Sequence, residues 1–173
     1  MIIRSKNFIL RPIKMSDLQG YFDCQQDEEA KKMFMSTPKN LKEAKKDLQK
    51  DLKEMHAKKP TREGFVIEVN GKFAGYIWFD EISYGFAKHK ASFGYVVRKD
   101  FRGQGLGSKA LKLMTDYAFK KYKLKRMYTY TRTFNKASAR ILEKAGFKLE
   151  GILRKNKFKN NKYLDDMLWA KVK

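Results

Sequence analysis

Three glycines at alternate positions, Gly103, Gly105 and Gly107, lie between an apolar run and a stretch with helical periodicity. A glycine inside a regular element lowers stability by roughly 1 kcal/mol relative to alanine, because its backbone loses more entropy on folding. A glycine turn that runs from a strand into a helix exposes unpaired backbone N–H groups at the positive end of the helix dipole, and this arrangement binds phosphate. The spacing therefore predicts an anion site at residues 103–108.

The neighbouring residues restrict which anion this site accepts. A P-loop is disfavoured because Ser108 separates Gly107 from Lys109. A dinucleotide-binding turn is disfavoured because the glycines do not follow the Gly-x-Gly-x-x-Gly spacing, and because the preceding strands form a hairpin. The pattern is instead Arg-x-x-Gly-x-Gly, which starts at Arg102 after an apolar strand that ends at Val97.

The elements around the loop must hold it in place, and hydrophobic periodicity with turn signals predicts them. Asn70-Gly71 between two apolar runs is the strongest hairpin signal. Ser16 and Thr37-Pro38 are predicted to begin helices, the second reaching Met55, and Asn135 to cap a helix over 135–147. Strands are predicted at 8–13, 64–69, 72–79, 91–98, 126–131, 147–153 and 163–172, and one more helix at 105–122. This order predicts one α+β (mixed α/β) domain over residues 1–173, with helices on both faces of its sheet.

Composition limits the class of protein. Hydrophobic residues make up 42% of the chain, and no apolar run approaches the roughly 20 residues that a membrane span needs. The N-terminal segment lacks the apolar core of a secretory signal, and the single cysteine, Cys24, permits no internal disulfide, so we expect a cytoplasmic protein. The formal net charge is +21, and most of it lies in residues 98–173. This favours an anionic partner, either a phosphorylated cofactor or nucleic acid, while scattered lysines are equally consistent with compositional drift.

The glycine pattern closely resembles the acetyl-coenzyme A signature of the GNAT acetyltransferases, and the resemblance covers nearly the whole chain. The segments NFILRPIKMSDL (7–18), NKASARILEKAGFKLEGILR (135–154) and Asp165-Asp166-Met167 resemble the Rim-type (RimJ/RimL) branch, which acetylates the N-termini of ribosomal proteins. The resemblance implies a GNAT fold: a mostly antiparallel sheet of about six to seven strands, with a V-shaped opening between strand 91–98 and strand 126–131.

The resemblance also implies a site for acetyl-CoA. Backbone groups of the strand that precedes the loop would pair with the pantetheine arm, the loop amides would hold the pyrophosphate, and Lys136 and Arg140 are candidates for the 3′-phosphate. The residues expected to contact the coenzyme are Tyr95, Val96, Val97, Arg102, Gly103, Gln104, Gly105, Leu106, Gly107, Ser108 and Asn135.

Acetyl transfer needs a neutral amine, a hydrogen-bond donor for the carbonyl oxygen and a proton for the leaving thiolate. The tyrosine that many family members use as the general acid is Leu142 here, and the glutamate that others carry on the opened strand is Ser92. Ser138 and Tyr130 are therefore the predicted catalytic residues, and a purely structural role stays open for both. Tyr128 lies on the same strand as Tyr130, and Asp80 and Glu81, at the end of the hairpin, could reach an amine or a water molecule. No residue cluster predicts a metal site.

The lack of an obvious strong base bears on the acceptor. An α-amine with a pKa of about 7.7–8.0 is roughly a tenth neutral at pH 7, whereas a lysine with a pKa of about 10.4 is almost entirely charged. The sequence therefore favours the N-terminal α-amine of a protein, such as a ribosomal protein. A small amine, such as a polyamine, antibiotic or amino acid, is the first alternative, and a non-catalytic RNA- or ribosome-binding module is the second. The high positive charge argues against polyamines unless an acidic pocket is built locally. Ribosome association, and a monomer or homodimer, stay open.

Overall fold

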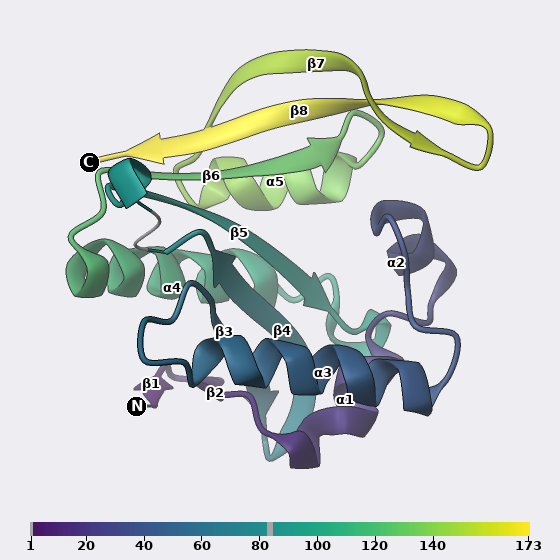
Figure 1. The fold of residues 1–173 in the computed structure, drawn as a ribbon, viewed down its shortest axis with the longest axis vertical. Helices are drawn as coiled ribbons and strands as arrows, with labels where there is room; N and C mark the ends of the chain where they lie inside the picture. The colour runs from purple at the N-terminus through teal and green to yellow at the C-terminus, as the bar shows by residue number, and fades with distance from the viewer. Residues whose placement is uncertain (1, 83–84) are drawn as a thin grey trace.

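The computed structural model describes residues 2–82 and 85–173, which form one mixed sheet with helices on both faces. The sheet order is β1-β2-β3-β4-β5-β6-β8-β7, and every neighbouring pair is antiparallel except β5 and β6 (Figure 1). The strands are β1 (Ile3–Arg4), β2 (Ile9–Pro12), β3 (Glu63–Val69), β4 (Lys72–Asp80), β5 (Lys90–Val97), β6 (Arg126–Arg132), β7 (Lys148–Lys159) and β8 (Lys162–Val172). The helices are α1 (Leu18–Asp23), α2 (Glu28–Met33), α3 (Leu41–Met55), α4 (Leu106–Tyr122) and α5 (Lys136–Lys144), with short 3-10 turns η1 (Met15–Asp17), η2 (Gly85–Ala87) and η3 (Lys99–Phe101).

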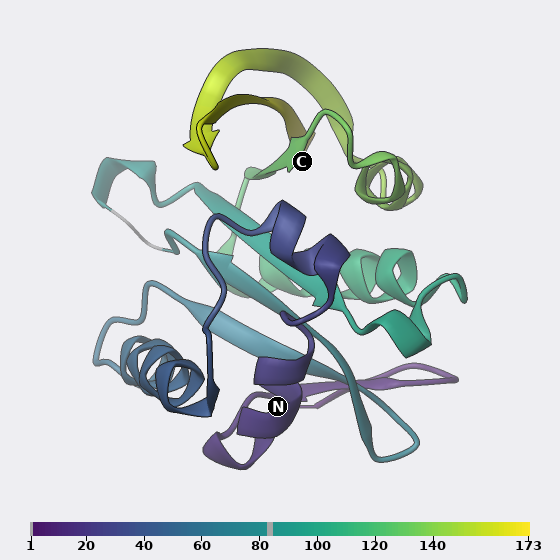
Figure 2. The ribbon, with the colours of Figure 1, turned by 90° about the vertical axis from the view of Figure 1, so that its right-hand side faces the viewer.

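Two hydrophobic clusters hold the layers together. The larger one lies between the sheet and the α4–α5 layer, where Phe79, Met114 and Met127 are fully buried. The smaller one joins the opposite face of the sheet to α1 and α3 through residues such as Leu48 and Val66. Figure 2 shows α3 on one side of the strands and α4 with α5 on the other. The predicted α+β class with helices on both faces is confirmed, and the described residues add one strand, the two-residue edge strand β1, to the seven predicted from periodicity.

The β3–β4 hairpin forms where the Asn-Gly signal predicts it. Asn70 and Gly71 both have positive φ, 49° and 73°, which matches the right-handed twist of the two strands. Helix α4 also begins within one residue of its predicted start, because glycines end the preceding loop and an apolar stripe follows.

Two predicted helix starts are wrong. Helix α3 begins at Leu41 rather than at Thr37-Pro38, because Asn40 Oδ1 accepts a hydrogen bond from Glu43 N–H at 3.0 Å and is the true N-cap. Ser16 caps nothing, since it lies inside η1, and Asp17 accepts the N–H of Lys14 instead. Helix α2 was not predicted at all, because its six residues carry no hydrophobic period long enough to recognise.

Strands β5 and β6 separate after a short parallel pairing. They pair only from Lys90↔Arg126 to Ser92↔Tyr128, and beyond that point they diverge (Figure 1). The side chain of Thr129 closes the vertex of this opening, since its Oγ1 donates to the Phe93 carbonyl at 2.8 Å. The V-shaped opening predicted between these two strands is therefore present. None of the described helices is long and apolar enough to cross a membrane.

Candidate active site

The three motif glycines meet two different structural requirements. Gly103 and Gly105 have positive φ, 80° and 69°, and a Cβ at either position would point into open space. Gly107 has ordinary helical geometry, but its Cβ would lie 3.1 Å from Ile141 Cδ1. The first two glycines therefore shape the turn, and the third permits α4 to pack closely against α5.

The turn leaves a row of backbone donors free. Among the described residues, no protein group accepts a hydrogen bond from the backbone N–H of any residue from Gly103 to Ser108. These groups stand at the first turn of α4, a 17-residue helix, where the helix dipole is positive. Unpaired amides at a helix start, next to open space at two glycines, fit a diphosphate.

The side chain of Arg102 is engaged within the protein. Its guanidinium makes a bidentate pair with Asp27, at 2.8 and 3.1 Å, and a further contact of 2.7 Å with Glu29, while its Nε donates to the Val97 carbonyl. These bonds tie the glycine turn to the start of α2. Although burial opposes it, the bonds from Arg102 and from Ala30 N–H hold the pKa of Asp27 below its ordinary value. A role for Arg102 in contact with the coenzyme stays a prediction.

Alternation along β5 decides which backbone groups face the opening. The carbonyl of Phe93 points to β6, since it accepts from Thr129. Residues two and four positions further, Tyr95 and Val97, therefore direct their N–H groups to the same side. Val96 directs its backbone groups to β4, where it pairs with Tyr76, and its contact with the coenzyme stays a prediction.

Ser138 and Tyr95 meet beside the opening. Asn135 caps α5 by accepting the Ser138 N–H at 3.0 Å, and this places Ser138 in the first turn of that helix. The Ser138 hydroxyl is 2.6 Å from the phenol oxygen of Tyr95 on β5. Burial raises the pKa of Tyr95 to about 12, although the bond with Ser138 opposes the rise. Two hydroxyl groups from different elements thus form one pair.

The opposite face of the sheet carries aromatic and acidic side chains at the vertex of the opening. Asp80, Ser92 and Tyr128 lie in register across β4, β5 and β6. The hydroxyl of Tyr128 donates to Glu81. Tyr130, next on this face of β6, is 46% exposed and packs edge-on against Tyr128. The face is therefore lined by groups that can hold a cationic amine, and we call residues 78, 80, 81, 128 and 130 the acceptor face.

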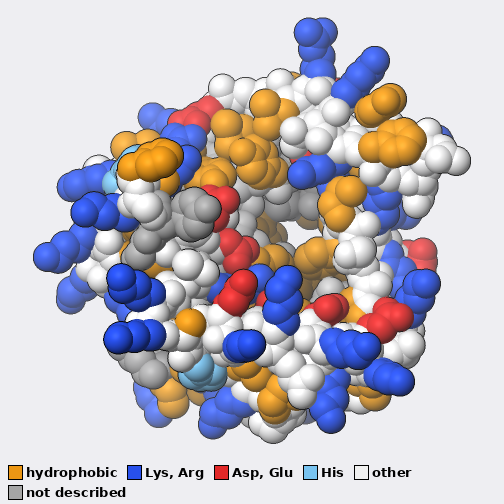
Figure 3. Space-filling model, in the orientation of Figure 1, with side chains coloured by type: hydrophobic (Ala, Val, Ile, Leu, Met, Phe, Trp, Pro, Cys, Tyr) orange, Lys and Arg blue, Asp and Glu red, His pale blue; other side chains and the backbone are white. Residues whose placement is uncertain are grey.

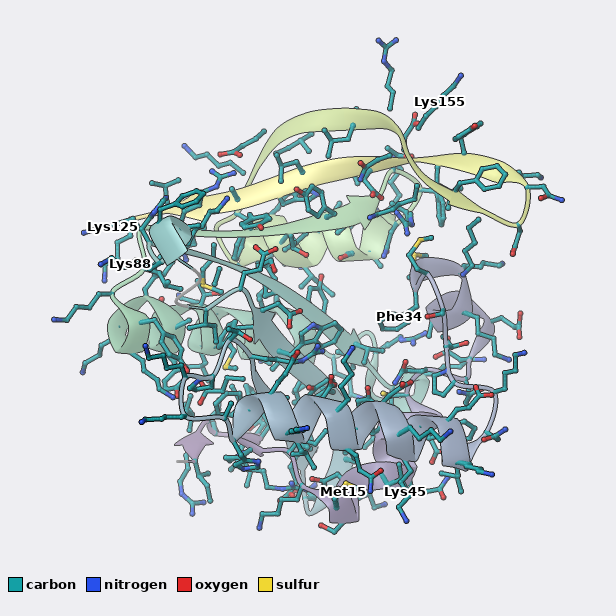
Figure 4. The ribbon with its side chains drawn as sticks, viewed as in Figure 1. Met15, Phe34, Lys45, Lys88, Lys125 and Lys155 are labelled. Carbon is teal, nitrogen blue, oxygen red and sulfur yellow. The ribbon has the colours of Figure 1, made fainter. Side chains whose placement is uncertain are left out.

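Trp78 is partly buried against the smaller hydrophobic cluster and forms the floor of the acceptor face. Its Nε1 donates to Asp80 at 2.9 Å, and its ring lies over Gly94 of β5, where a Cβ would approach the ring to 2.2 Å. Phe34, at the end of α2, stacks on the same indole with ring centroids 6.4 Å apart. Figure 4 labels Phe34 on the side of α2 that faces the sheet.

A buried ionic network extends the acceptor face toward α3. Arg62 lies 3.2 Å from Asp51 and 3.3 Å from Asp80, between the sheet and α3. Burial raises the pKa of both carboxyl groups, although the charge of Arg62 opposes the rise. In Figure 3 a hollow opens in the middle of this face, with acidic side chains beside it and most Lys and Arg side chains at the periphery. The overall positive charge of the chain is thus locally reversed.

Three further residues, Leu142, Glu150 and Cys24, have structural positions. Leu142 is fully buried in the main core, and Glu150 makes an ion pair with Arg126 that lowers the pKa of Glu150. Cys24 is buried, and burial raises the pKa of its thiol to about 12. In the described part of the chain no cluster of His, Cys, Asp and Glu is suited to a metal ion.

Sequence reasoning missed the ion pairs that assemble the site. Arg102 finds Asp27 at a separation of 75 residues, and Arg62 finds Asp80 across the β3–β4 hairpin. No local sequence pattern indicates such partners, since a charged residue on a short helix is usually predicted to be exposed to solvent. Helix α2 also brings Phe34 into contact with Trp78, and no local sequence pattern indicates this contact between distant segments.

Comparison with known families agrees with this geometry. Residues 7–148 match the family model described as an acetyltransferase (GNAT) domain. The chain belongs to the GNAT acetyltransferase family. As a GNAT acetyltransferase it is an acetyl-CoA-dependent N-acetyltransferase, and the eight-stranded sheet with its opening is the fold of that family.

Relatives of this GNAT acetyltransferase act on different amines. Spermidine N(1)-acetyltransferase of Escherichia coli (strain K12) is 29% identical over 154 residues, which are 89% of this chain and 80% of the relative. An acetyltransferase from Salmonella typhimurium that modifies the N-terminal serine of ribosomal protein L7/L12 superposes with a TM-score of 0.86 at 24% identity, covering 100% and 99% of the two chains. A structure of RimL in complex with coenzyme A has a TM-score of 0.81 at 23% identity, covering 99% and 98%.

Proposed function

We propose that this protein transfers an acetyl group from acetyl-CoA bound in the β5–β6 opening to a primary amine on the acceptor face, and that the amine is the N-terminal α-amine of a protein such as a ribosomal protein. The observation that carries the proposal is the opening between β5 and β6 beside the free amides of Gly103 to Ser108. A peptide-like arm fits a gap in a sheet, and a diphosphate fits a helix start.

Different backbone groups of the chain bind different parts of acetyl-CoA. Backbone groups of Tyr95 and Val97 hold the pantetheine arm, and the amides of the glycine turn hold the pyrophosphate. Gln104, Leu106 and Ser108 contribute only through their backbone N–H groups, since Leu106 is buried and Ser108 Oγ donates to the Gly105 carbonyl at 3.1 Å. Acetyl-CoA supplies a thioester, which is an acyl group activated toward amines.

Four groups of the protein then serve the transfer. The N–H of Tyr95 faces the opening, nearer to Ser138 and Asp80 than that of Val97, and donates to the carbonyl oxygen as negative charge develops there. Asp80 accepts the proton that the amine loses, directly or through a water molecule, and its raised pKa makes it a better proton acceptor than an exposed aspartate. Ser138 Oγ donates a proton to the leaving sulfur. Tyr130 contacts the acceptor from its exposed position on β6.

An α-amine is the acceptor that this machinery suits best. A single carboxylate paired with Arg62 is a modest base, and an α-amine with a pKa of about 7.7–8.0 needs far less help than a lysine side chain. Exposed apolar side chains near the opening, including Met35 and Phe134, favour an extended polypeptide over a compact metabolite.

A second acceptor class is favoured by one specific observation. Asp80 and Glu81, next to the buried Asp51, provide the local acidic charge without which a strongly basic protein would repel a polycation. A small amine with a further cationic group, such as a polyamine, is therefore the alternative acceptor.

The proposal is tested by measuring acetyl-CoA binding by calorimetry and acetyl transfer by mass spectrometry, with N-terminal peptides and polyamines as acceptors. Gly105→Leu should abolish coenzyme binding, since a side chain there fills the space beside the amides. Gly71→Leu is the matched control, because Gly71 also combines positive φ with open space and lies in the β3–β4 turn. It should cost about 1–3 kcal/mol of stability and leave binding intact. Normal coenzyme binding by Gly105→Leu would refute the site, and transfer to polyamines alone would refute the α-amine as acceptor.

A further inference from the structure

The mechanism above gives no role to the phenol of Tyr95, a partly buried group that packs against the main core beside the opening. Sequence reasoning assigned this residue only a backbone contact, yet its side chain crosses from β5 to the first turn of α5. The oxygen atoms of Tyr95 and Ser138 are 2.6 Å apart, the distance of a strong O–H···O hydrogen bond.

We infer that Tyr95 is a positioning residue for catalysis: its phenol donates a hydrogen bond to Ser138 Oγ and so directs the Ser138 proton into the β5–β6 opening, toward the leaving sulfur. The inference rests on the proposed function, because it requires Ser138 to be the proton donor.

The direction of the bond follows from the acidity of the two groups. A phenol is a stronger acid than a serine hydroxyl, so it is the better donor in a pair of this kind. Burial raises the pKa of Tyr95 to about 12, so the phenol keeps its proton at neutral pH. When Ser138 Oγ accepts the hydrogen bond from Tyr95, its own O–H must point elsewhere.

Packing holds both partners in place. The Tyr95 ring stacks on Phe93 with centroids 6.4 Å apart, and Phe93 packs in turn on Phe147 after α5. Ser138 is held through its backbone by the Asn135 cap. A hydroxyl whose position is fixed from two sides loses little entropy when it reacts, which is the advantage of a preorganised donor.

The bond also stabilises the charge that develops on Ser138. During transfer the C–S bond breaks as the C–N bond forms, the Ser138 O–H bond breaks and the sulfur gains that proton. Negative charge appears on Ser138 Oγ, where the Tyr95 hydrogen bond becomes stronger. The amine releases one proton and Ser138 recovers one from solvent, so the overall reaction is balanced.

The test compares Tyr95→Phe, Ser138→Ala and the double variant in steady-state kinetics. Tyr95→Phe keeps the ring and the backbone groups and should lower kcat about tenfold, with KM for acetyl-CoA unchanged. Ser138→Ala should lower kcat about a hundredfold. The double variant should be no slower than Ser138→Ala, because Tyr95 acts only through that hydroxyl. Tyr122→Phe removes a remote phenol that bonds to Glu63 and should behave as wild type.

The outcomes separate this inference from the function on which it rests. The role of Tyr95 would be overturned if Tyr95→Phe had the kcat of wild type. It would also be overturned if the Tyr95→Phe substitution lowered kcat by the same factor in the wild-type and Ser138→Ala backgrounds. Neither result would contradict acetyl transfer itself. Full activity of Ser138→Ala would remove the proton donor from the proposed mechanism and this inference with it. Thermal unfolding of each variant identifies a loss caused by misfolding, and rescue by Ser138→Thr, which restores a hydroxyl, is expected where Ser138→Ala is slow.

Discussion

At the scale of single residues, the absence of a side chain at Gly94 shapes the acceptor face. The Trp78 indole occupies the space above Gly94, and this position lets its Nε1 reach Asp80. Sequence alone reads Gly94 as a weak point in a strand. In the structure it permits a large ring to lie flat on the sheet beside the opening.

Gly94→Ala should therefore damage the acceptor side of the site selectively. The new Cβ would meet the indole at 2.2 Å, so Trp78 must move and its bond to Asp80 must break. We expect KM for the amine to rise about tenfold, a change of about 1.4 kcal/mol, and stability to fall by about 1–3 kcal/mol. Steady-state kinetics with each substrate varied in turn measures this, and KM for acetyl-CoA should not change.

Gly151→Ala is the matched control, since a Cβ at Gly151 of β7 meets nothing within 4 Å. A variant Gly94→Ala with a normal KM for the amine would show that Trp78 does not form the acceptor face.

At the scale of elements, Arg102 joins the glycine turn, residues 103–108, to helix α2 beside the acceptor face. It binds Asp27 and Glu29 at the start of α2, and α2 ends next to Phe34, which stacks on Trp78. Lys159 at the end of β7 completes the connection, since its ammonium donates to the carbonyls of Lys31 and Phe34. A helix of six residues is too short to be stable alone, so these contacts hold α2 in place.

Removing the guanidinium should lower stability in a pH-dependent way. The pKa of Asp27 is lower in the folded state than its unfolded value of 3.8. The pair with Arg102 therefore stabilises the folded protein at pH values above 3.8, and this stabilisation is lost as the pH falls through the lower folded pKa. Arg102→Gln should cost about 1 kcal/mol at pH 7, and this difference from wild type should shrink below about pH 4. Urea unfolding of both proteins between pH 3 and 7 measures it.

Asp27→Asn and Asp27→Ala separate the two functions of the carboxylate. Asparagine keeps the hydrogen bond to Ala30 N–H that caps α2 and loses only the charge, whereas alanine loses both. If the Arg102→Gln difference stayed constant down to pH 3, the ion pair would not be its source.

At the scale of the whole molecule, two opposite charge patterns coexist. The chain carries a net charge of +21, while acidic side chains gather beside the hollow of Figure 3. A positive exterior concentrates an anionic coenzyme near the protein, and an acidic interior attracts a cationic acceptor. Lys136 and Arg140 are exposed basic residues near the start of α5, the helix that packs against the first turn of α4, whereas Lys45 projects from α3 away from the sheet (Figure 4).

Coenzyme capture should therefore slow in salt and depend on where the charge lies. Raising ionic strength from about 0.01 to 0.15 M shortens the Debye length from about 30 to about 8 Å, and the association rate should fall about tenfold. Replacing Lys136 and Arg140 by Glu should slow association more than replacing Lys45 and Lys46 by Glu, although each pair changes the net charge equally. Stopped-flow binding measures both rates, and equal effects of the two pairs would indicate nonspecific attraction.

The amino-acid sequence by itself determined the parts of this protein that depend on neighbours along the chain. The Asn-Gly turn, the glycine turn, the Asn135 cap and the apolar periods of β5 and α4 are local, because backbone conformation and amphipathic spacing act over a few residues. The family signature is local too, since backbone amides that bind a diphosphate need only glycines at a helix start.

Only the tertiary structure decided which side chains meet. The bond of Tyr95 to Ser138, the pairing of Arg102 with Asp27 and the position of Trp78 over Gly94 join residues that lie on different elements. The start of α3 also differs from the prediction: Asn40 and Thr37-Pro38 are both acceptable helix starts in isolation, and in the structure the Asn40 side chain caps the helix. The physical reason is the same in each case: side-chain contacts between distant segments are set by how the layers pack, and a linear pattern does not record the packing.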